Sequence, residues 1–304
     1  MSEKLSFVSS LFRICSGTAV FMTLRNHSWG RTIFHSILLS LILAAVISGF
    51  EHARMRGVYE AAKRSFINCF GDEIELVSGG FVPEKDPDKC RSIALPDGGK
   101  LWYVPDGKIS RCTGFEENQY LIFWAPGGFA FAIRNQDSWT FNTAVPEKNT
   151  RMLFSKSRVI STAELQKYQL KSREPWSMGD EDDLDVEELF RIVAVVSMMF
   201  LMIQNLMLTL ILPLLYTSVF VGMFRLTSGG RYPIRLTYAQ FWKTGIYAGF
   251  PALLVASAFP ALNLPFFTFS TVYMTGLLIY WLYTAHRLER QLAKEEMETA
   301  NELQ

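Results

Sequence analysis

Four long apolar stretches without a single Asp, Glu, Lys or Arg constrain the fold more strongly than any other feature of this sequence. They span residues 32–50, 192–224, 244–262 and 266–283. A helix of about 20 apolar residues is long enough to cross a hydrocarbon core of about 30 Å. Inside that core every backbone N–H and C=O group needs an internal partner, which a helix supplies. The sequence therefore predicts an α-helical polytopic membrane protein with four transmembrane helices.

The overall composition agrees with a membrane protein and argues against binding of nucleic acid. Of the 304 residues, 49% are hydrophobic and only 19% are charged. Thirty Lys and Arg residues against 29 Asp and Glu residues leave a formal net charge of +1. A chain this close to neutrality lacks the basic field that holds a phosphate backbone. We therefore expect the lipid bilayer, and no nucleic acid, as a partner.

The position, length and spacing of these stretches predict the kind of helix that each one forms. The first stretch could belong to a secretory signal peptide, but it starts about thirty residues into the chain and no small-x-small cleavage pattern precedes Glu51, so we expect an uncleaved anchor. The second stretch is longer than one perpendicular crossing requires and contains Pro213, which predicts a tilted or kinked helix. Only Asn263, Leu264 and Pro265 separate the third stretch from the fourth, which predicts a tight antiparallel helical hairpin.

Basic residues indicate on which side of the membrane the connecting segments lie. The segment before the first span has four Lys and Arg residues and one acid, and residues 225–243 have four and no acid. Such clusters are typical of cytoplasmic loops. Three basic residues after the fourth span place the C-terminus on the same side, as four crossings require. The basic residues are Lys4, Arg13, Arg25 and Arg31, then Arg225, Arg231, Arg235 and Lys243, and finally Arg287, Arg290 and Lys294.

Residues 51–191, on the outer side in this topology, are numerous enough for one small domain with its own core. Helical spacing continues after the first span, so we expect a stalk that extends outward until Gly71 ends it. A capping-box pattern at residues 161–164 predicts a short helix. An acidic run at residues 180–188 precedes the second span, where carboxylates favour a helix N-terminus. Calcium binding is the alternative, but the EF-hand spacing and its turn glycine are missing.

The rest of the outer segment alternates short strand patterns with turn signals, so the sequence predicts a small α+β domain. The clearest hairpin joins residues 120–124 to residues 129–133. In its second strand Phe129, Phe131 and Ile133 share one face, and two alanines share the other. We expect a sheet that is covered on both sides, with a helix against the alanine face. Approach of a ligand to the alanine face is the alternative.

Three of the four cysteines, Cys69, Cys90 and Cys112, lie in the outer segment, and Cys15 lies before the first span. An odd number leaves at least one thiol without an intramolecular partner. We prefer a disulfide between Cys90 and Cys112, since both fall in the strand-and-turn region and the bond would stabilise a small core by roughly 3 kcal/mol. Three free thiols are the alternative, because the sequence does not fix the redox compartment.

The sequence contains none of the common catalytic or cofactor-binding motifs. A nucleophile elbow, a phosphate-binding loop, a dinucleotide-binding glycine pattern and a helical zinc motif are all absent. No cysteine pair has metal-ligand spacing. We therefore expect a protein that is not an enzyme and that has no metal or cofactor. The four histidines lie in or beside span ends, where we expect interfacial or packing roles: His27, His35, His52 and His286.

Polar and small side chains within the spans are the remaining candidates for a specific role. Gln204 and Asn205 interrupt the second span and point about 100° apart on a helix. Such amides usually hydrogen bond to neighbouring helices, although they can also line a transport pathway. Pro251 would bend the third span and free a backbone carbonyl. The small residues expected to permit close helix packing are Gly245, Gly249 and Gly276.

The chain resembles a known family in two stretches and in the order of its parts. The stretches are Ser28-Trp29-Gly30-Arg31 before the first span, and Arg235-Leu236-Thr237-Tyr238 leading to Tyr247 and Pro251. They resemble the bacterial integral-membrane family called domain of unknown function 1189, some members of which are labelled maltodextrin-utilisation proteins. The resemblance implies a location in the bacterial cytoplasmic (inner) membrane and an association with sugar uptake by label only. It implies no catalytic or ligand residues.

Together these patterns favour a non-enzymatic inner-membrane accessory, sensing or scaffolding protein, whose outer domain binds or interacts and whose helices dock a membrane-protein partner or a second copy. The alternative is a small oligomeric transporter or channel with its pathway near Gln204, Asn205 and Pro251. A membrane-embedded enzyme is the third interpretation, and no set of residues supports it. The expected segments are 1–31 (cytoplasmic, with an interfacial helix from Leu5 to Met22), 32–50 (span one), 51–191 (outer α+β domain), 192–224 (span two), 225–243 (basic cytoplasmic loop), 244–262 (span three), 266–283 (span four) and 284–304 (cytoplasmic tail).

Overall fold

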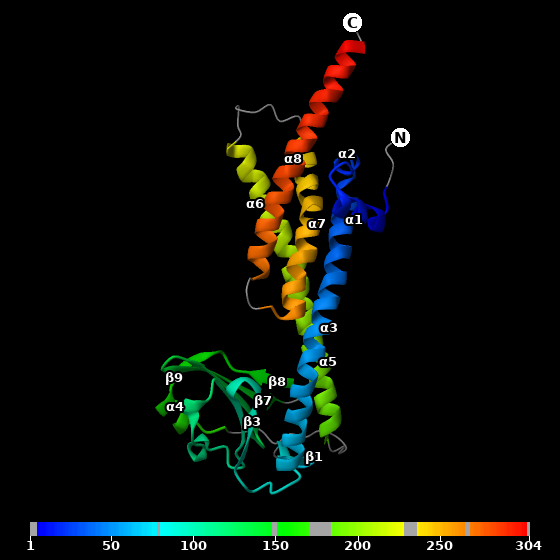
Figure 1. Cartoon of the computed structure of the whole chain (residues 1–304). Coiled ribbons are helices and arrows are strands. Elements are labelled where there is room, and N and C mark those ends of the chain that lie inside the picture. Colours follow the sequence, from blue (N-terminus) through cyan, green and yellow to red (C-terminus); the bar gives the residue numbers. More distant parts are fainter. Residues whose placement is uncertain are drawn as a thin grey trace. The chain divides into compact units, whose positions relative to one another are not determined.

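The computed structural model consists of two compact units (Figure 1). The first, which we call the helical unit, contains Met1–Ala53 and Ser197–Gln304, and the second, which we call the sheet unit, contains Arg54–Val196. The described residues are 5–77, 80–147, 151–170, 184–227, 236–264 and 268–302.

Helices account for the regular structure in the described part of the helical unit. Two of them, α3 and α5, also continue into the sheet unit. The helices are α1 (Phe7–Ser16), α2 (Phe21–Leu24), α3 (Trp29–Phe70), α5 (Val186–Leu206), α6 (Leu212–Thr227), α7 (Tyr238–Leu262) and α8 (Phe269–Glu302), with a π-helical turn, η4 (Met207–Ile211), between α5 and α6.

Three helical segments are long and apolar enough to cross a membrane: Trp29–Phe70, Val186–Leu226 and Tyr238–Leu262. They contain the first three predicted spans and indicate a multi-pass membrane protein. The fourth predicted span, 266–283, begins in residues outside the described part and continues in α8, which is not among these three. The fourth crossing therefore stays a prediction.

The N-terminal segment differs from the single interfacial helix expected from Leu5 to Met22. Its first helix, α1, ends at Ser16, and α2 is a separate short turn. Leu5 and Ile14 are buried in the core of the helical unit, whereas Val8 and Phe12 are 57% and 72% exposed. Val8 and Phe12 remain available to face lipid, so the interfacial position of this segment stays a prediction.

The second predicted span contains the π-helical turn η4 just before Pro213, where the sequence predicts a kink. Because proline has no N–H, the carbonyl of Thr209 lacks the donor that a regular α-helix would supply. The hydroxyl of Ser40 in α3 donates to this carbonyl over 2.8 Å. The hydroxyl of Thr209 in turn lies 3.2 Å from the carbonyl of Ser40. The proline and the wide turn thus coincide with a polar contact between two apolar helices.

α7 is the central helix of the helical unit, because α1, α2, α6 and α8 all pack against it. A capping box of Thr237 with Gln240 begins it, and Asn263 with a left-handed φ of 54° follows its last residue. Fourteen of its 25 residues are buried. α8 lies alongside α7, as the helical-hairpin prediction requires (Figure 1).

Glycines bring α7 close to its neighbours. The three glycines that the sequence singles out all lie at such contacts, two on α7 and one on α8. At each of them an added Cβ would need its neighbour to shift, so these positions require the smallest side chain. The contacts that the added Cβ would make are Tyr273 Oη at 2.6 Å for Gly249, Thr217 Cγ2 at 2.9 Å for Gly245, and Ala252 Cβ at 3.0 Å for Gly276.

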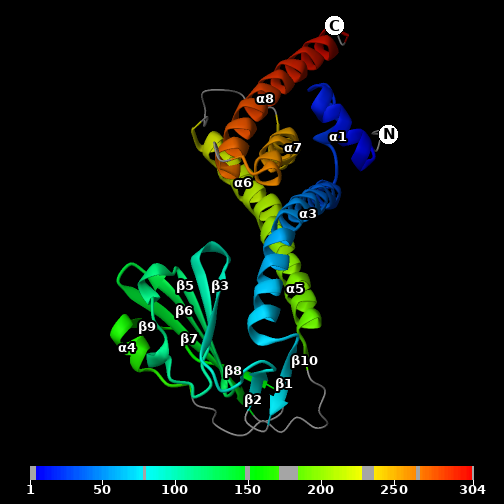
Figure 2. The ribbon, with the colours of Figure 1, turned by 60° about the horizontal axis from the view of Figure 1, so that its bottom comes forward.

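The sheet unit contains two sheets and short helices (Figure 2). The elements are β1 (Glu73–Val77), β2 (Gly80–Pro83), β3 (Arg91–Leu95), η1 (Pro96–Gly98), β4 (Gly99–Tyr103), η2 (Ile109–Arg111), η3 (Phe115–Glu117), β5 (Tyr120–Ala125), β6 (Gly128–Asn135), β7 (Ser138–Glu147), β8 (Arg151–Phe154), β9 (Arg158–Ser161), α4 (Thr162–Lys167) and β10 (Leu184–Asp185). An α+β domain between the first long helix and the later helices is therefore confirmed.

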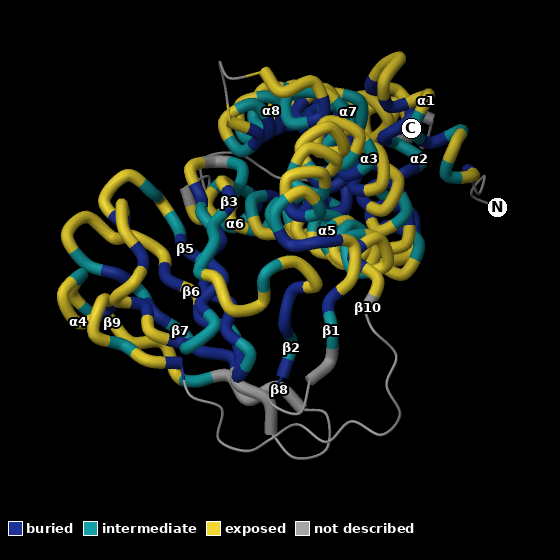
Figure 3. The backbone as a smooth tube through the Cα atoms, turned by 90° about the horizontal axis from the view of Figure 1, so that it is seen from below, coloured by how far each residue is buried: buried dark blue, intermediate teal, exposed yellow. Residues whose placement is uncertain are grey.

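The larger sheet has the strand order β3-β4-β5-β6-β7-β8, with β9 also paired to β7, and the smaller has the order β10-β1-β2. Among the described pairs β4 with β5 is parallel and the others are antiparallel. The predicted hairpin is confirmed as β5 and β6, with Tyr120 opposite Ile133. The central strands are largely buried, whereas β9 and the end of β6 are exposed (Figure 3).

The two faces of the larger sheet have different covers. On the alanine side of the sheet α4 packs against the neighbouring strands β7 and β9, and its Leu165 belongs to the same core as Ala130 and Ala132. The predicted helix on this face is thus confirmed. The opposite face packs on the ends of α3 and α5 only at part of its length, and Phe131 and Ile133 are exposed. The expectation of a sheet covered on both sides is therefore wrong for this part of β6.

The ends of α3 and α5 in the sheet unit follow the local sequence signals. α3 continues to Phe70, and Gly71 with a φ of 102° ends it, as the stalk prediction requires. Asp185 accepts a hydrogen bond from the N–H of Glu187 over 2.7 Å in the first turn of α5. This contact agrees with the expected role of the acidic run, although residues 180–183 lie outside the described residues.

We predict that Gly249→Ala lowers the stability of the protein, because the new methyl group must displace the buried hydroxyl of Tyr273. Overpacking of this kind costs roughly 1–3 kcal/mol. The matched control is Gly222→Ala in α6, where an added Cβ meets nothing within 4 Å and where alanine favours a helix by up to about 1 kcal/mol. Thermal unfolding followed by circular dichroism in detergent measures both. A Gly249→Ala variant as stable as Gly222→Ala would contradict the tight contact.

Candidate functional site

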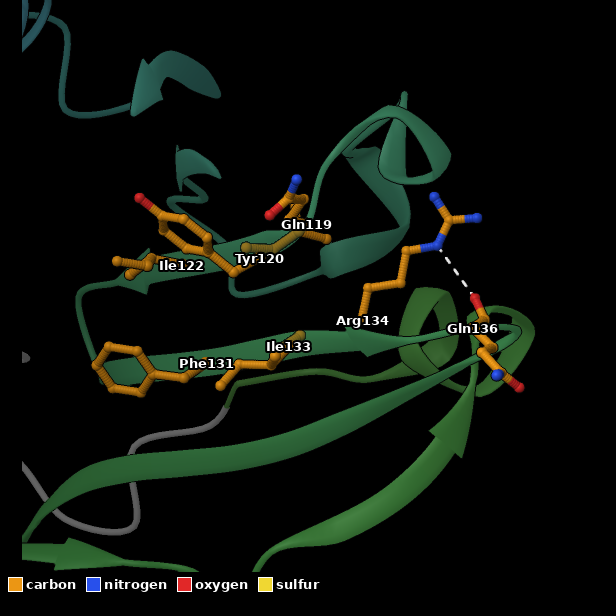
Figure 4. A pocket seen from close by; sticks show the side chains of 9 residues that line it. Gln119, Tyr120, Ile122, Phe131, Ile133, Arg134 and Gln136 are labelled. Atoms are coloured by element: carbon orange, nitrogen blue, oxygen red, sulfur yellow. Dashed lines mark hydrogen bonds between the residues drawn. The ribbon is translucent and has the colours of Figure 1, made fainter. Parts of the chain in front are cut away.

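An open apolar face lies on β5 and β6 (Figure 4). It consists of Tyr120, Ile122, Phe131 and Ile133, and we call it the open face. These residues line a hollow of about 670 Å³. The antiparallel register pairs Tyr120 with Ile133 and Ile122 with Phe131, so the four side chains are cross-strand neighbours. A hollow of this volume, lined mainly by apolar groups, is typical of a site for a small ligand.

The register and the cover of the sheet explain why the open face is accessible. Trp124 and Phe129 are paired farther along the same hairpin. The end of α3 covers that part, where Phe66 stacks on Trp124 with the ring centroids 5.9 Å apart. Phe131 and Ile133 instead have exposed fractions of 38% and 56%. Large apolar side chains that are exposed together are uncommon on a protein surface and mark interaction sites.

Polar groups border the open face at one end. The guanidinium group of Arg134 is fixed by its Nε, which donates to the carbonyl of Gln136 over 3.2 Å, and by a second hydrogen bond to the carbonyl of Glu116. The hydroxyl of Tyr120 donates to the carbonyl of Pro96 over 2.7 Å, so the ring is held in place. The site therefore combines an apolar floor with one positive charge at its border (Figure 4).

The sequence pattern predicted the large residues of this strand but not their exposure. The alternation of Phe131 and Ile133 with alanines correctly separated the two faces of β6. It did not predict how far the opposite face is covered, because α3, which covers part of that face, ends about sixty residues earlier in the chain. An unusual row of large residues opposite a row of alanines was the available signal.

The structure brings Cys90 and Cys112 together, whereas Cys69 and Cys15 lie elsewhere. All four are thiols in the structure. The side chains of Cys90 and Cys112 are hydrogen-bonded to each other, and burial, with the neighbouring Cys90, raises the pKa of the Cys112 thiol well above its ordinary value. A disulfide between the two stays a prediction, which their side-chain contact supports.

Asn205 and Gln204 have different surroundings in the helical unit. Asn205 is buried, and its Nδ2 donates to the hydroxyl of Ser48 over 3.1 Å and to the carboxylate of Glu51 over 2.8 Å. Gln204 is exposed. Asn205 therefore joins α5 to α3 through hydrogen bonds, which lipid tails cannot form.

The alternative interpretation, a transport pathway near Gln204, Asn205 and Pro251, requires that these residues line a common cavity. The described part of the helical unit shows no such cavity. A small cavity between α6, α7 and α8 has a volume of about 10 Å³ and is lined by Thr217, Gly249 and Tyr273 among others. It has room for about one water molecule. Neither Asn205 nor Pro251 lines it. The geometry of this cavity therefore gives a transport pathway no support.

Two of the histidines that lie beside the span ends contact the same tyrosine. The hydroxyl of Tyr247 lies 2.9 Å from Nδ1 of His27 and 3.1 Å from Nδ1 of His35. Lys243 donates from Nζ to the backbone carbonyl of His27 over 2.7 Å. Burial, together with Arg31 and other positive neighbours, lowers the pKa of His27 to about 4, so this histidine is neutral at pH 7. We call His27, His35, Lys243 and Tyr247 the histidine cluster.

The described residues contain no group of three or more His, Cys, Asp or Glu side chains that could hold a metal ion. The histidine cluster contains two histidines with hydrogen bonds to a hydroxyl group, and it has no carboxylate or thiolate ligand among the residues that contact it. Metal binding there has no support from the ligand set.

The comparisons with known proteins give no further guidance. No protein-family model, no curated protein and no solved structure matches the chain.

We predict that unreduced, denatured protein from native membranes contains two free thiols, because Cys90 and Cys112 are bonded to each other. A thiol titration with a chromogenic disulfide reagent gives the count. The Cys112→Ala variant should then contain three free thiols, since it releases Cys90. Four free thiols in the natural protein and three in Cys112→Ala would show that the disulfide does not form.

Proposed function

We propose that this chain is a membrane-anchored, non-enzymatic binding protein whose sheet unit takes up an amphipathic ligand on the open face. The observation that supports this most directly is the exposure of Phe131 and Ile133 over a hollow of about 670 Å³. Burial of apolar surface is worth about 25 cal/mol per Å², so covering these side chains would contribute substantially to affinity. The helical unit serves as the anchor and docks a membrane-protein partner or a second copy.

The shape and charge of the site define the class of ligand. Four apolar side chains favour an apolar body, such as an acyl chain or a ring system. Arg134 at the border favours a carboxylate or another anionic or carbonyl group at one end of the ligand. A long-chain carboxylic acid combines both features, so it is the ligand class for which we propose the site.

The proposal includes a topology of four crossings with both termini in the cytoplasm and the sheet unit outside. Three long apolar helices support a multi-pass protein. The basic residues before α3 and in residues 225–243 support the orientation. A location in a bacterial inner membrane, and an accessory role beside a sugar-uptake system, rest on the family resemblance alone.

Photolabelling with a diazirine-bearing long-chain carboxylic acid tests the ligand site on the full chain in lipid nanodiscs. We expect saturable adducts on residues 120–133, which excess unlabelled acid removes, because the open face offers the acid an apolar floor and a cation. Peptide mass spectrometry locates each adduct and so separates this site from labelling of the membrane helices.

Phe131→Ser combined with Ile133→Ser should reduce these adducts at least tenfold, since both exposed apolar groups are lost. The matched control is Val159→Ser in β9, where an equally apolar side chain is 72% exposed but lies outside the hollow. Equal labelling of the double variant and the natural protein would contradict the proposal, as would adducts confined to the helical unit.

The topology has its own test with single-cysteine variants. A membrane-impermeant maleimide should label Val159→Cys in right-side-out membrane vesicles when the four natural cysteines are replaced by alanine. A variant that keeps only Cys15, which is also exposed, should react only after the vesicles are opened. Labelling of Cys15 in closed vesicles together with protection of Val159→Cys would reverse the proposed orientation.

A further inference from the structure

The histidine cluster contains a buried cation that lacks a counter-charge. Lys243 has an exposed fraction of only 8%. Its ammonium group has three N–H donors, and the structure gives it one acceptor, the carbonyl of His27. No carboxylate of the described residues lies within ion-pair distance of it. A buried charge without an opposite charge is costly, so the site calls for an anion.

The neighbours of Lys243 add positive character and hydrogen-bonding capacity. Arg31 lies in the first turn of α3, close enough to His27 to act on its charge. The N-terminal turn of α3 contributes the positive end of a helix dipole. His27 is 6% exposed, and its Nε2 is buried without a hydrogen-bond partner among the described residues. Two cations and a helix N-terminus thus lie near His27, whose Nε2 is unpartnered, and no acid of the described residues forms an ion pair with Lys243 or Arg31.

Two tryptophans place this group at the expected depth of a membrane interface. The rings of Trp29 and Trp242 are in contact, with centroids 4.7 Å apart, and Trp29 is 43% exposed. Tryptophan is enriched at the level of the lipid headgroups. These residues are direct neighbours of Lys243 and of the segment that contains His27 and Arg31. The anions that a membrane offers at this level are the phosphate groups of its lipids.

We propose that Lys243, Arg31 and His27 bind the headgroup phosphate of an anionic membrane lipid. Lys243 would donate to the phosphate with the N–H groups that His27 leaves unused, and its four-carbon stem lets the ammonium group reach the interface. Arg31 would approach the phosphate from the first turn of α3. A choline headgroup is disfavoured, because its cation would face two positive side chains. Basic pockets between membrane helices are known to favour anionic headgroups in this way.

The tyrosine of the cluster would hold this site in shape. The hydroxyl of Tyr247 has one proton, so it donates to one histidine and accepts from the other. This arrangement ties the segment before α3 to α7 through His27 and α3 itself through His35. Phosphate binding at Lys243 would therefore also secure α1 and α2, which pack against α7.

Native mass spectrometry of the full chain in detergent measures the binding. The protein is titrated with phosphatidylglycerol and, separately, with phosphatidylcholine of identical acyl chains. We expect one saturable site that binds phosphatidylglycerol at least tenfold more tightly than phosphatidylcholine. Lys243→Gln should weaken the binding of phosphatidylglycerol at least tenfold. The matched control Arg290→Gln removes an exposed charge from α8 and should change nothing.

Arg31→Gln provides a second variant if Lys243→Gln does not fold, because Arg31 is only half-buried. It should also weaken the binding of phosphatidylglycerol several-fold. A titration with inorganic phosphate, read by the shift in melting temperature, separates a free-phosphate site from a lipid site: a lipid site gives no shift at millimolar phosphate. Equal affinity for the two lipids, a shift with phosphate that equals the shift with phosphatidylglycerol, or binding that survives both variants would overturn the proposal.

Discussion

The helical unit depends on close contact around α7. In lipid the hydrophobic effect does not drive helices together, so packing and hydrogen bonds must do so. Four helices pack against α7. At the tightest contacts between α7 and α8, a glycine of one helix faces a side chain of the other. Gly249 under Tyr273 is the clearest example. The other helices of the unit are arranged around the surface that these glycines create.

Polar groups within the apolar helices follow the same constraint. Pro213 in the second span has no N–H, so the carbonyl of Thr209 lacks its helical donor. The hydroxyl of Ser40 in α3 donates to this carbonyl instead. One turn away Asn205 reaches Ser48 and Glu51. Each of these groups would be costly in hydrocarbon if it had no partner. The polar side chains in these two helices therefore serve first to hold the helices together, which leaves little reason to assign them to a pathway.

The two proposed sites have a common physical origin. Each contains groups for which the described residues do not provide enough partners. In the first site these are apolar side chains without cover, and in the second they are buried polar groups without hydrogen-bond partners. On the sheet unit these groups are Phe131 and Ile133, which lie beyond the cover that α3 provides. In the helical unit they are the ammonium of Lys243 and Nε2 of His27. An apolar ligand would satisfy the first proposed site and an anion the second, so the two can be tested separately.

The sequence by itself determined the elements whose cause is local. Uncharged apolar length predicted the long helices, the period of two residues predicted the hairpin of β5 and β6, and a capping box predicted the start of α4. These signals lie within a few residues of the element they specify, so one chain suffices to see them. The extent of the N-terminal helix is the local feature that differs, because the expected single helix is interrupted after Ser16.

Only the tertiary structure decided which surfaces are covered and which distant groups meet. It placed α4 on the alanine face and left Phe131 exposed, and it joined His27 to Tyr247 across 220 residues of chain. It also separated Asn205, which is bonded to α3, from Gln204, which is exposed. Such contacts depend on how elements pack after they have formed, and the packing of one element is not encoded in its own periodicity. Both proposed sites depend on such contacts between distant parts of the chain.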